Sequence, residues 1–335
     1  MKSYQDANRL IFNKKSKNGH YESYFLRANH PSKKLAFWFR YTIFKPKDSG
    51  QETIAEVWGA FFKEDEIVAI QQDVPLDKCD FTSSSDFLGI STSKLTFLKN
   101  GKASVNGELE NKQNSITWQL NYTGKESPLL LLPFQYYKRR LPKAKALVGL
   151  PNALFDGSIQ VNNKSYTITN WQGSENHNWG SQHTDEYAWG QVCGFDNQPN
   201  SFLECSTARI KLGPFWSPWM NLAVLRIAGK EYRFSGLWRA INNQGHYGYF
   251  DWTMQCESRE YQLQIKIKGS PKGFVAFYYK NPPGGRHTCL NSKVAFCKII
   301  LSKNGKEIHH LTSQNKAAFE ILTDDKQHGI ELRNI

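Results

Sequence analysis

Short stretches that alternate apolar and polar side chains follow one another through almost the whole chain. Residues 35–44, 116–122 and 187–194 each place large side chains on one side at a period of two. Asn162-Asn163 and Asn304-Gly305 separate other such stretches, and dipeptides of this kind favour two-residue hairpin turns. The pattern indicates no helix of four turns. It therefore predicts an all-β protein built from antiparallel β-barrels or sandwiches.

The 335-residue chain is 39% apolar, which is enough for two hydrophobic cores. Pro133, Pro142 and Pro151 interrupt the strand pattern and mark a boundary. We therefore predict a basic N-terminal arm (1–20), an N-terminal β domain (21–145) and a C-terminal β domain (146–335). The two domains are expected to pack side by side, and the C-terminal domain is expected to carry the functional site. The pattern does not specify an oligomeric state.

The charge is strongly basic, with 43 Lys and Arg against 30 Asp and Glu, a net +13. Such a charge permits nucleic acid, an anionic membrane or an acidic ligand as a partner. The basic run Lys138–Lys145 is a candidate for transient contact with an anionic membrane surface, and a solvated linker is the simpler alternative. No pattern for reading nucleic-acid bases is present, so we expect no nucleic-acid partner.

The six cysteines form no C-x-x-C pair, and we expect buried thiols in a reducing compartment. The first twenty residues contain no apolar signal region, which predicts a cytoplasmic protein. A chain that begins after a removed signal would look the same and would be periplasmic. His177 and His183 lack a metal-site spacing, so we expect no metal ion.

Residues 171–191 contain three Trp, one Tyr, two His and three acidic residues. Gly173 and Gly180 predict turns within this segment. Beyond them the strand alternation places Tyr187 and Trp189 on one face, with small residues on the other. This arrangement predicts a strand whose large face looks into a cavity and whose small face lies under another layer. The alternative is that Tyr187 and Trp189 are plain core residues, each with a partner for its polar tip.

We predict Glu175 and His177 as catalytic residues. A carboxyl group desolvated among tryptophans has a raised pKa and can act as a general acid. The alternatives are a solvated turn carboxylate for Glu175 and a structural, hydrogen-bonded histidine for His177. Arg40 is either a cation inside the cavity or a charge at its rim. The predicted ligand-binding residues are Trp38, Arg40, Trp171, Asn178, Trp179, His183, Tyr187, Trp189 and Gln191.

The segment 174–195, SENHNWGSQHTDEYAWGQVCGF, resembles the N-W-G and W-x-Q region of tocopherol cyclases. Trp38-x-Arg40-x-Thr42 resembles the first domain of the same superfamily, which includes carotenoid hydratases, bacterial attachment-locus proteins and lipocalin-like Diels–Alderases. The resemblance runs in order through residues 20–310. In one respect the chain departs from the hydratases, because Asn176 stands where they are expected to carry an acid.

The resemblance implies two lipocalin-like barrels with a hydrophobic small molecule, such as an isoprenoid, polyene or lipid, near their interface. It further implies cofactor-free, acid-catalysed cyclisation or hydration of a double bond. Such reactions need a proton donor, a dry pocket and aromatic faces that stabilise cationic character. The residues alone leave a second interpretation open, a non-enzymatic carbohydrate-binding β-protein that uses Trp and Tyr platforms.

Overall fold

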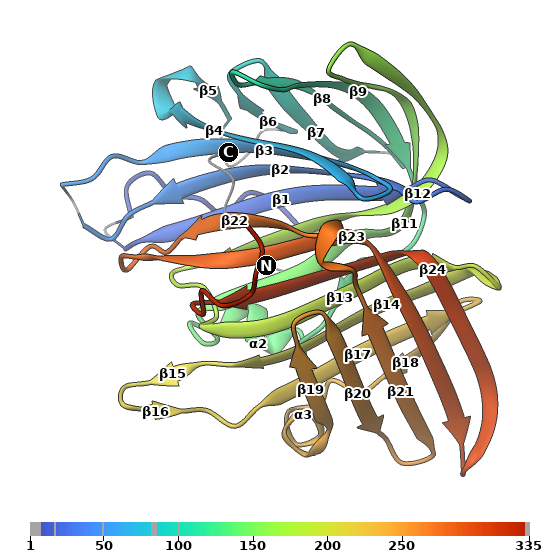
Figure 1. Cartoon of the computed structure of the whole chain (residues 1–335). Coiled ribbons are helices and arrows are strands. Elements are labelled where there is room, and N and C mark those ends of the chain that lie inside the picture. The colour runs from blue at the N-terminus through green and yellow to red at the C-terminus, as the bar shows by residue number, and fades with distance from the viewer. Residues whose placement is uncertain (1–7, 17, 49, 82–85, 100, 332–335) are drawn as a thin grey trace.

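The computed structural model describes residues 8–16, 18–48, 50–81, 86–99 and 101–331, and it consists almost entirely of β-strands. Two large antiparallel sheets follow one another along the chain and lie side by side (Figure 1). The predicted all-β architecture of two packed lipocalin-like barrels is confirmed.

The first sheet pairs its strands in the order β4-β3-β2-β1-β12-β11-β9-β8-β7-β6-β5, with β10 beside β11. Its strands are β1 (His20–Asn29), β2 (Leu35–Lys45), β3 (Ile54–Lys63), β4 (Glu66–Pro75), β5 (Cys79–Asp80), β6 (Phe87–Ile90), β7 (Ser93–Lys99), β8 (Lys102–Glu110), β9 (Ser115–Thr123), β10 (Leu129–Leu130), β11 (Ala144–Val161) and β12 (Lys164–Gly180).

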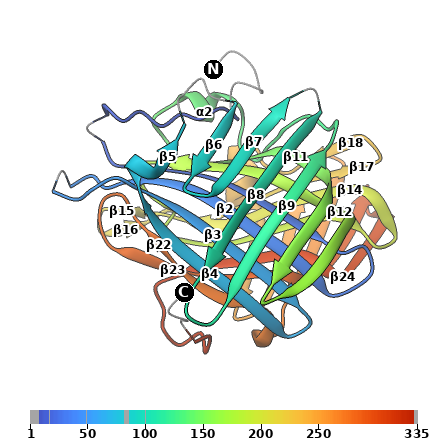
Figure 2. The ribbon, with the colours of Figure 1, turned by 90° about the horizontal axis from the view of Figure 1, so that it is seen from above.

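This sheet curls until its two halves cross, with β7–β9 above β2–β4 (Figure 2). The enclosed core joins the halves through aromatic side chains. Phe39 of β2 stacks on Trp118 of β9, with ring centroids 4.2 Å apart, and Phe37 contacts Phe155 of β11 edge to face. Such pairs bury large apolar areas, so they hold the barrel closed across the gap between distant strands.

The second sheet has the order β18-β17-β14-β13-β24-β23-β21-β20-β19, with β22 beside β23. Its strands are β13 (Glu186–Phe195), β14 (Gln198–Arg209), β17 (Met220–Ile227), β18 (Lys230–Arg233), β19 (Gln244–Gly248), β20 (Asp251–Glu257), β21 (Tyr261–Lys268), β22 (Val275–Lys280), β23 (Arg286–Lys303) and β24 (Lys306–Thr323). Inside it, Trp252 packs on Phe319 and donates its indole N–H to Thr207 over 3.0 Å.

The remaining elements are short. They are the hairpin of β15 (Lys211–Leu212) and β16 (Phe215–Trp216), the helices α2 (Gln135–Lys138) and α3 (Leu237–Asn242), and the 3-10 turns η1 (Leu76–Lys78) and η2 (Pro271–Gly273). Among the described residues, no helix has the length and apolar character that crossing a membrane requires.

The sheets change over between Gly180 and Glu186 rather than at residue 145. The prolines of the connecting segment suggested the earlier boundary, but β11 and β12 both pair within the first sheet. The predicted second domain therefore begins too early. In the N-terminal arm, residues 1–7 and 17 lie outside the described residues. Leu10 and Phe12 are buried in the first core, so this part of the arm is docked.

Candidate functional site

A cavity of about 230 Å³ lies between the two barrels and is lined by residues of both. The first barrel contributes Phe25, Arg40 and Asn178, and the second contributes Trp189, Glu204 and Tyr279. The volume is just below the usual range of about 300–1,000 Å³ for pockets that hold drug-sized ligands. The cavity therefore suits a compact group or the end of a longer molecule.

The alternation of β13 supplies one wall of the cavity. Tyr187 and Trp189 line it, whereas Ala188 belongs to the core of the second barrel. A Cβ atom at Gly190 would overlap Ile267 and Trp252, so the small face of the strand fits closely over that core. The large face of β13 therefore lies on the cavity, and its small face lies under the core of the second barrel.

Glu204 of β14 is an acidic residue of the cavity wall with a raised pKa. It is 4% exposed and lines the cavity. Burial raises the pKa of Glu204 to about 7, against the opposing effect of two hydrogen bonds. The Trp189 indole N–H donates to Oε1 over 2.7 Å, and the Gln191 amide donates to Oε2 over 2.9 Å. A carboxyl group with this pKa exists in both protonation states near neutral pH, as acid catalysis requires.

Gln191 connects this carboxyl group to the first barrel. Its amide nitrogen also donates to Asn176 Oδ1 over 2.8 Å. Its Oε1 accepts from Ser174 Oγ over 2.7 Å and from the Arg27 guanidinium over 3.1 Å. Because every polar atom of the Gln191 side chain is engaged, its orientation is fixed, and so is the donor it presents to Glu204.

A second carboxylate in the cavity wall, Glu320 of β24, is paired. Lys293 is fully buried and donates to Glu320 Oε1 over 2.7 Å, and Asn291 donates to the same oxygen over 3.0 Å. Burial lowers the pKa of Lys293, although the negative charge of Glu320 opposes the change. This carboxylate is therefore occupied by structural partners, whereas Glu204 has no cation within ion-pair distance among the described residues.

Arg40 is a cation inside the cavity, which decides between the two predicted alternatives. Its guanidinium lies 4.2 Å from the ring centroid of Tyr279 and 4.9 Å from that of Trp58. It donates through Nε to Thr42 and through Nη2 to Ser23. The other amino group, Nη1, makes no hydrogen bond to any described residue. The group can therefore bind an oxygen atom of a ligand.

Several predicted ligand residues meet at this cavity. Arg40, Asn178, His183, Tyr187 and Trp189 line it. Burial and the charge of Arg40 hold the pKa of His183 well below its usual value, so this ring is neutral. Gln191 lies just behind the wall as a partner of Glu204. Trp38 packs in the cluster between the barrels, with Lys293 Nζ 5.4 Å from its ring centroid.

The two residues predicted as catalytic do not lie on this cavity. Glu175 is buried on the opposite side of β12, where it accepts hydrogen bonds of 2.6 Å from Asn8 and from Tyr122. His177 Nε2 lies 2.9 Å from Glu22 Oε1, and its ring stacks on Tyr24. Both side chains thus belong to the interior of the first barrel, and neither lines the cavity that contains Trp189.

Trp171 and Trp179 also lie outside the cavity, because they are on the same face of β12 as Glu175 and His177. Trp171 belongs to the first core, and Trp179 packs on Tyr137 and His177. The predicted turn at Gly173 does not form, because β12 runs unbroken to Gly180. A Cβ atom at Gly173 would overlap the carbonyl oxygen of Arg27, so this glycine permits two strands to pack closely. From Trp171 to Trp179, the odd-numbered residues of β12 consequently face the first barrel, whereas Asn176 and Asn178 on the other side of the strand line the cavity.

Glu204, Lys293 and Glu320 were missed by sequence reasoning. Glu204 is the one charged residue in the segment SFLECSTA, and Lys293 is the one charged residue in LNSKVAFC. A single charge in an otherwise apolar strand is the signal that indicates a buried, functional or paired group.

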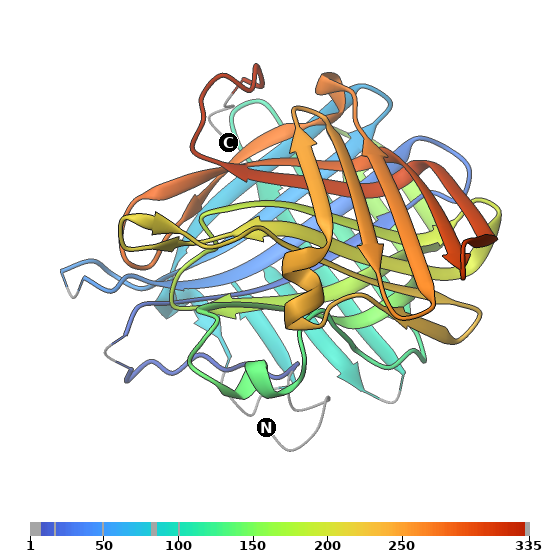
Figure 3. The ribbon, with the colours of Figure 1, turned by 90° about the horizontal axis from the view of Figure 1, so that it is seen from below.

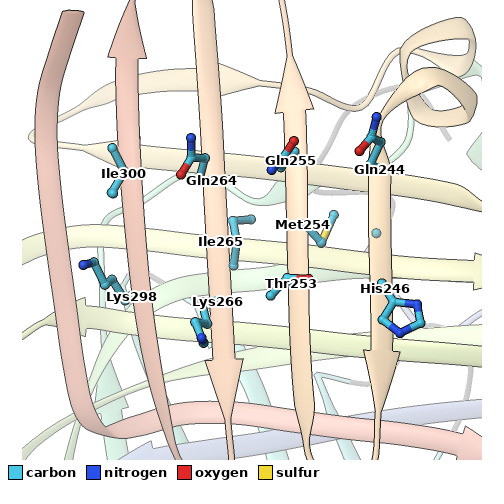
Figure 4. A pocket seen from close by; sticks show the side chains of 11 residues that line it. Gln244, His246, Thr253, Met254, Gln255, Gln264, Ile265, Lys266, Lys298 and Ile300 are labelled. Atoms are coloured by element: carbon cyan, nitrogen blue, oxygen red, sulfur yellow. The ribbon is translucent and has the colours of Figure 1, made fainter.

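A larger concavity of about 410 Å³ lies over β19–β21 and β23 (Figure 4). The side chains that Figure 4 labels there include Gln244, Gln255, Gln264, Lys266 and Lys298, which stand on the solvent face of the strands. Its lining contains no carboxylate and no buried titratable group, so we do not assign chemistry to it. Among the described residues, no cluster of three or more His, Cys, Asp or Glu side chains is arranged to hold a metal ion.

The sequence profile of the tocopherol cyclase-like family matches residues 142–322, more than half of the chain. The chain belongs to this family. Its matched region contains the β13 wall, Glu204 and the Lys293–Glu320 pair, so most of the cavity lies in the part that defines the tocopherol cyclase-like proteins.

Two uncharacterised proteins, from two strains of Mycobacterium tuberculosis, are each 26% identical to this family member over 196 residues. The match covers 58% of this chain and 58% of each relative, so the chain spans little more than half the length of the curated relatives.

Solved structures extend the likeness to both barrels. An AttH-type protein of Nitrosomonas europaea has a TM-score of 0.59 at 12% identity, covering 91% of this chain and 92% of that one. Kievitone hydratase from Nectria haematococca has a TM-score of 0.58 at 10% identity, covering 92% and 89%. CghA with bound Sch210972 gives the same TM-score, identity and coverage as kievitone hydratase. At these identities the likeness shows the fold alone.

Proposed function

We propose that the cavity binds the unsaturated end of an isoprenoid or polyene and that Glu204 protonates its double bond. The observation that carries the proposal is a buried carboxyl group with a pKa of about 7 in the wall of an aromatic cavity. Membership of the tocopherol cyclase-like family supports a reaction of the cyclase or hydratase type. The aromatic residues are enclosed between two barrels, which favours an apolar ligand over the carbohydrate alternative.

The reaction is redox-neutral and needs only the proton of Glu204. That proton passes to the less substituted alkene carbon, and the π electrons form the new C–H bond. The resulting carbocation is captured by the oxygen of a phenol in the same molecule, which forms a C–O bond and closes a ring. The phenolic proton then returns to Glu204, so acid and product are both neutral at the end. Capture by water in place of the phenol gives hydration.

The other cavity residues have roles that follow from their positions. Trp189, Tyr187 and Phe25 present aromatic side chains to the ligand, and such faces stabilise cationic character. The free Nη1 of Arg40 is suited to hold the oxygen-bearing end of the substrate. We therefore propose a substrate with an apolar alkene part and a phenolic or similar oxygen.

The test uses a prenylated phenol in heavy water. The wild-type protein is expected to form a cyclised or hydrated product with one deuterium at the protonated carbon, detected by mass spectrometry. Glu204→Gln is expected to lower turnover at least about 100-fold while the substrate still binds. Glu257→Gln, at an exposed position of β20, is the matched control and should retain full turnover. Equal turnover in Glu204→Gln and wild type would remove the proposed proton donor.

A further inference from the structure

An exposed surface at the entrance of the cavity combines apolar and basic side chains. We call it the entrance surface and define it by Leu212, Phe215 and Trp216 of the β15–β16 hairpin with Lys138, Arg139, Arg140, Leu141 and Lys143 of the connecting segment. Figure 3, seen from below, shows the yellow hairpin extending to the left and the green turn of α2 at the lower edge.

The hairpin presents large apolar side chains to solvent. Phe215 is 73% exposed and Leu212 is 56% exposed, and the two residues pair across the hairpin. The ring of Trp216 lies beneath the guanidinium of Arg209, 4.1 Å away, and near Lys211 Nζ, 5.0 Å away. Isolated exposed apolar residues are common, but aromatic and aliphatic residues gathered at one tip indicate a contact surface.

The connecting segment supplies positive charge without compensation. Between Glu126 and Asp156 the sequence contains no acidic residue. Lys138, Arg139 and Arg140 are exposed beside Leu141, which is 62% exposed. Lys145, which the sequence grouped with them, is not available, because it is 9% exposed and donates to the carbonyl oxygen of Pro142.

Both parts of the surface border the same opening. Pro142 and Ala144 of the connecting segment line the cavity, as do Ile210 and Ser217 at the base of the hairpin. Ile210 is exposed, so the cavity reaches solvent between the two segments. A ligand that enters the cavity here passes directly between the apolar tip and the basic run.

We propose that the entrance surface docks on an anionic lipid bilayer, from which the cavity takes its apolar ligand. Apolar tips that enter the headgroup region and lysine or arginine residues that face anionic lipids are the two elements of reversible membrane binding. The charge of +13 adds long-range attraction to such a surface. That the bilayer supplies the ligand rests on the proposed function. The membrane contact itself does not, because it depends only on the exposed residues of the entrance surface.

The test is flotation of the full chain with vesicles of phosphatidylcholine alone or mixed with phosphatidylglycerol. The wild-type protein is expected to float with the anionic vesicles, weakly or not at all with the neutral ones, and less at about 0.5 M salt, where charges are screened beyond a few ångströms. Leu212→Glu/Phe215→Glu is expected to weaken binding at least about tenfold. A second variant replaces four basic residues by Glu, and its binding to anionic vesicles is expected to be about 100-fold weaker or more. These residues are Lys138, Arg139, Arg140 and Lys143.

Lys306→Glu/Ile308→Glu is the matched control, because it places two acidic residues on the exposed β23–β24 hairpin. It should bind within about twofold of wild type. The melting temperature of each variant shows that it is folded, and these exposed positions are expected to tolerate the change. The proposal would be overturned if the wild-type protein did not bind anionic vesicles. It would also be overturned if the entrance variants bound as strongly as the control variant.

The two proposals fail separately. Glu204→Gln should bind vesicles as wild type does, because the residue is buried and is not part of the entrance surface. The Leu212→Glu/Phe215→Glu variant should convert a short, water-soluble prenylated phenol at the wild-type rate. Loss of that conversion by the entrance variant would show that the hairpin serves the chemistry and not docking.

Discussion

Trp189 donates its indole N–H to Glu204 Oε1 over 2.7 Å, from one strand to the next. Gln191, two residues along the same face of β13, donates to the other carboxyl oxygen. Residues at i and i+2 of a strand share a face, so a single strand positions both donors. The two donors fix the carboxyl group at the cavity wall. Burial raises the pKa of Glu204, so the group stays partly protonated near neutral pH.

The raised pKa of Glu204 predicts the pH dependence of turnover. A general acid must be protonated, so kcat/KM should be constant at low pH and fall tenfold per pH unit above about 7. Trp189→Phe removes a hydrogen bond that favours the charged form and should move this fall to higher pH. A profile that is flat from pH 5 to pH 9 would exclude Glu204 as the acid.

The same pKa predicts a change in stability with pH. The folded value of about 7 lies above the ordinary value of 4.5, so the folded protein holds this proton more tightly than the unfolded chain. Stability is therefore greatest below pH 4.5 for this group and declines as the pH rises to about 7. The free energy of unfolding of Glu204→Gln, measured by urea denaturation, should lack this decline. An unchanged decline in the variant would assign it to other groups.

Glu175→Gln is expected to affect stability and not turnover. The carboxylate accepts hydrogen bonds from Asn8 and Tyr122 inside the first barrel, and the glutamine amide can satisfy only one such donor. The cost should be about 1–3 kcal/mol in the free energy of unfolding. Turnover of a prenylated phenol should stay within about twofold of wild type. A variant that is as stable as wild type but inactive would instead identify Glu175 as the proton donor.

The buried pair of Lys293 and Glu320 should be costly to break. Lys293→Met leaves Glu320 as an uncompensated buried charge and should cost about 3–5 kcal/mol of stability. Lys293→Met/Glu320→Gln should recover part of this loss, since no charge remains unpaired. The exposed pair of Lys303 and Glu260 is the control, and its disruption should cost less than about 1 kcal/mol.

Gly173→Ala tests the close packing of β12 on β1. The added methyl group would overlap the carbonyl oxygen of Arg27, which belongs to the backbone and cannot rotate away. We expect a loss of more than about 3 kcal/mol or failure to fold. Gly248→Ala is the matched control, because a Cβ atom there meets no neighbour. Equal melting temperatures for the two variants would contradict the observed strand register.

The sequence predicted the strands well because period-two alternation is a local property. Tyr187 and Trp189 were placed on a cavity face for this reason. The orientation of Glu175 was not predictable in the same way, because it depends on which barrel each face of β12 encloses. That choice follows from the long β11–β12 hairpin pairing with β1, a contact between segments about 150 residues apart. The grouping of Glu204 with Glu320 likewise exists only after β13, β14 and β24 have paired.

The most direct measurement is a crystal structure of the protein soaked with a prenylated phenol. The account predicts ligand density between the barrels, with the alkene beside the Glu204 carboxyl group and the oxygen near Arg40. Density inside the first barrel next to Glu175, or a cavity that stays empty while the protein turns the compound over, would contradict it.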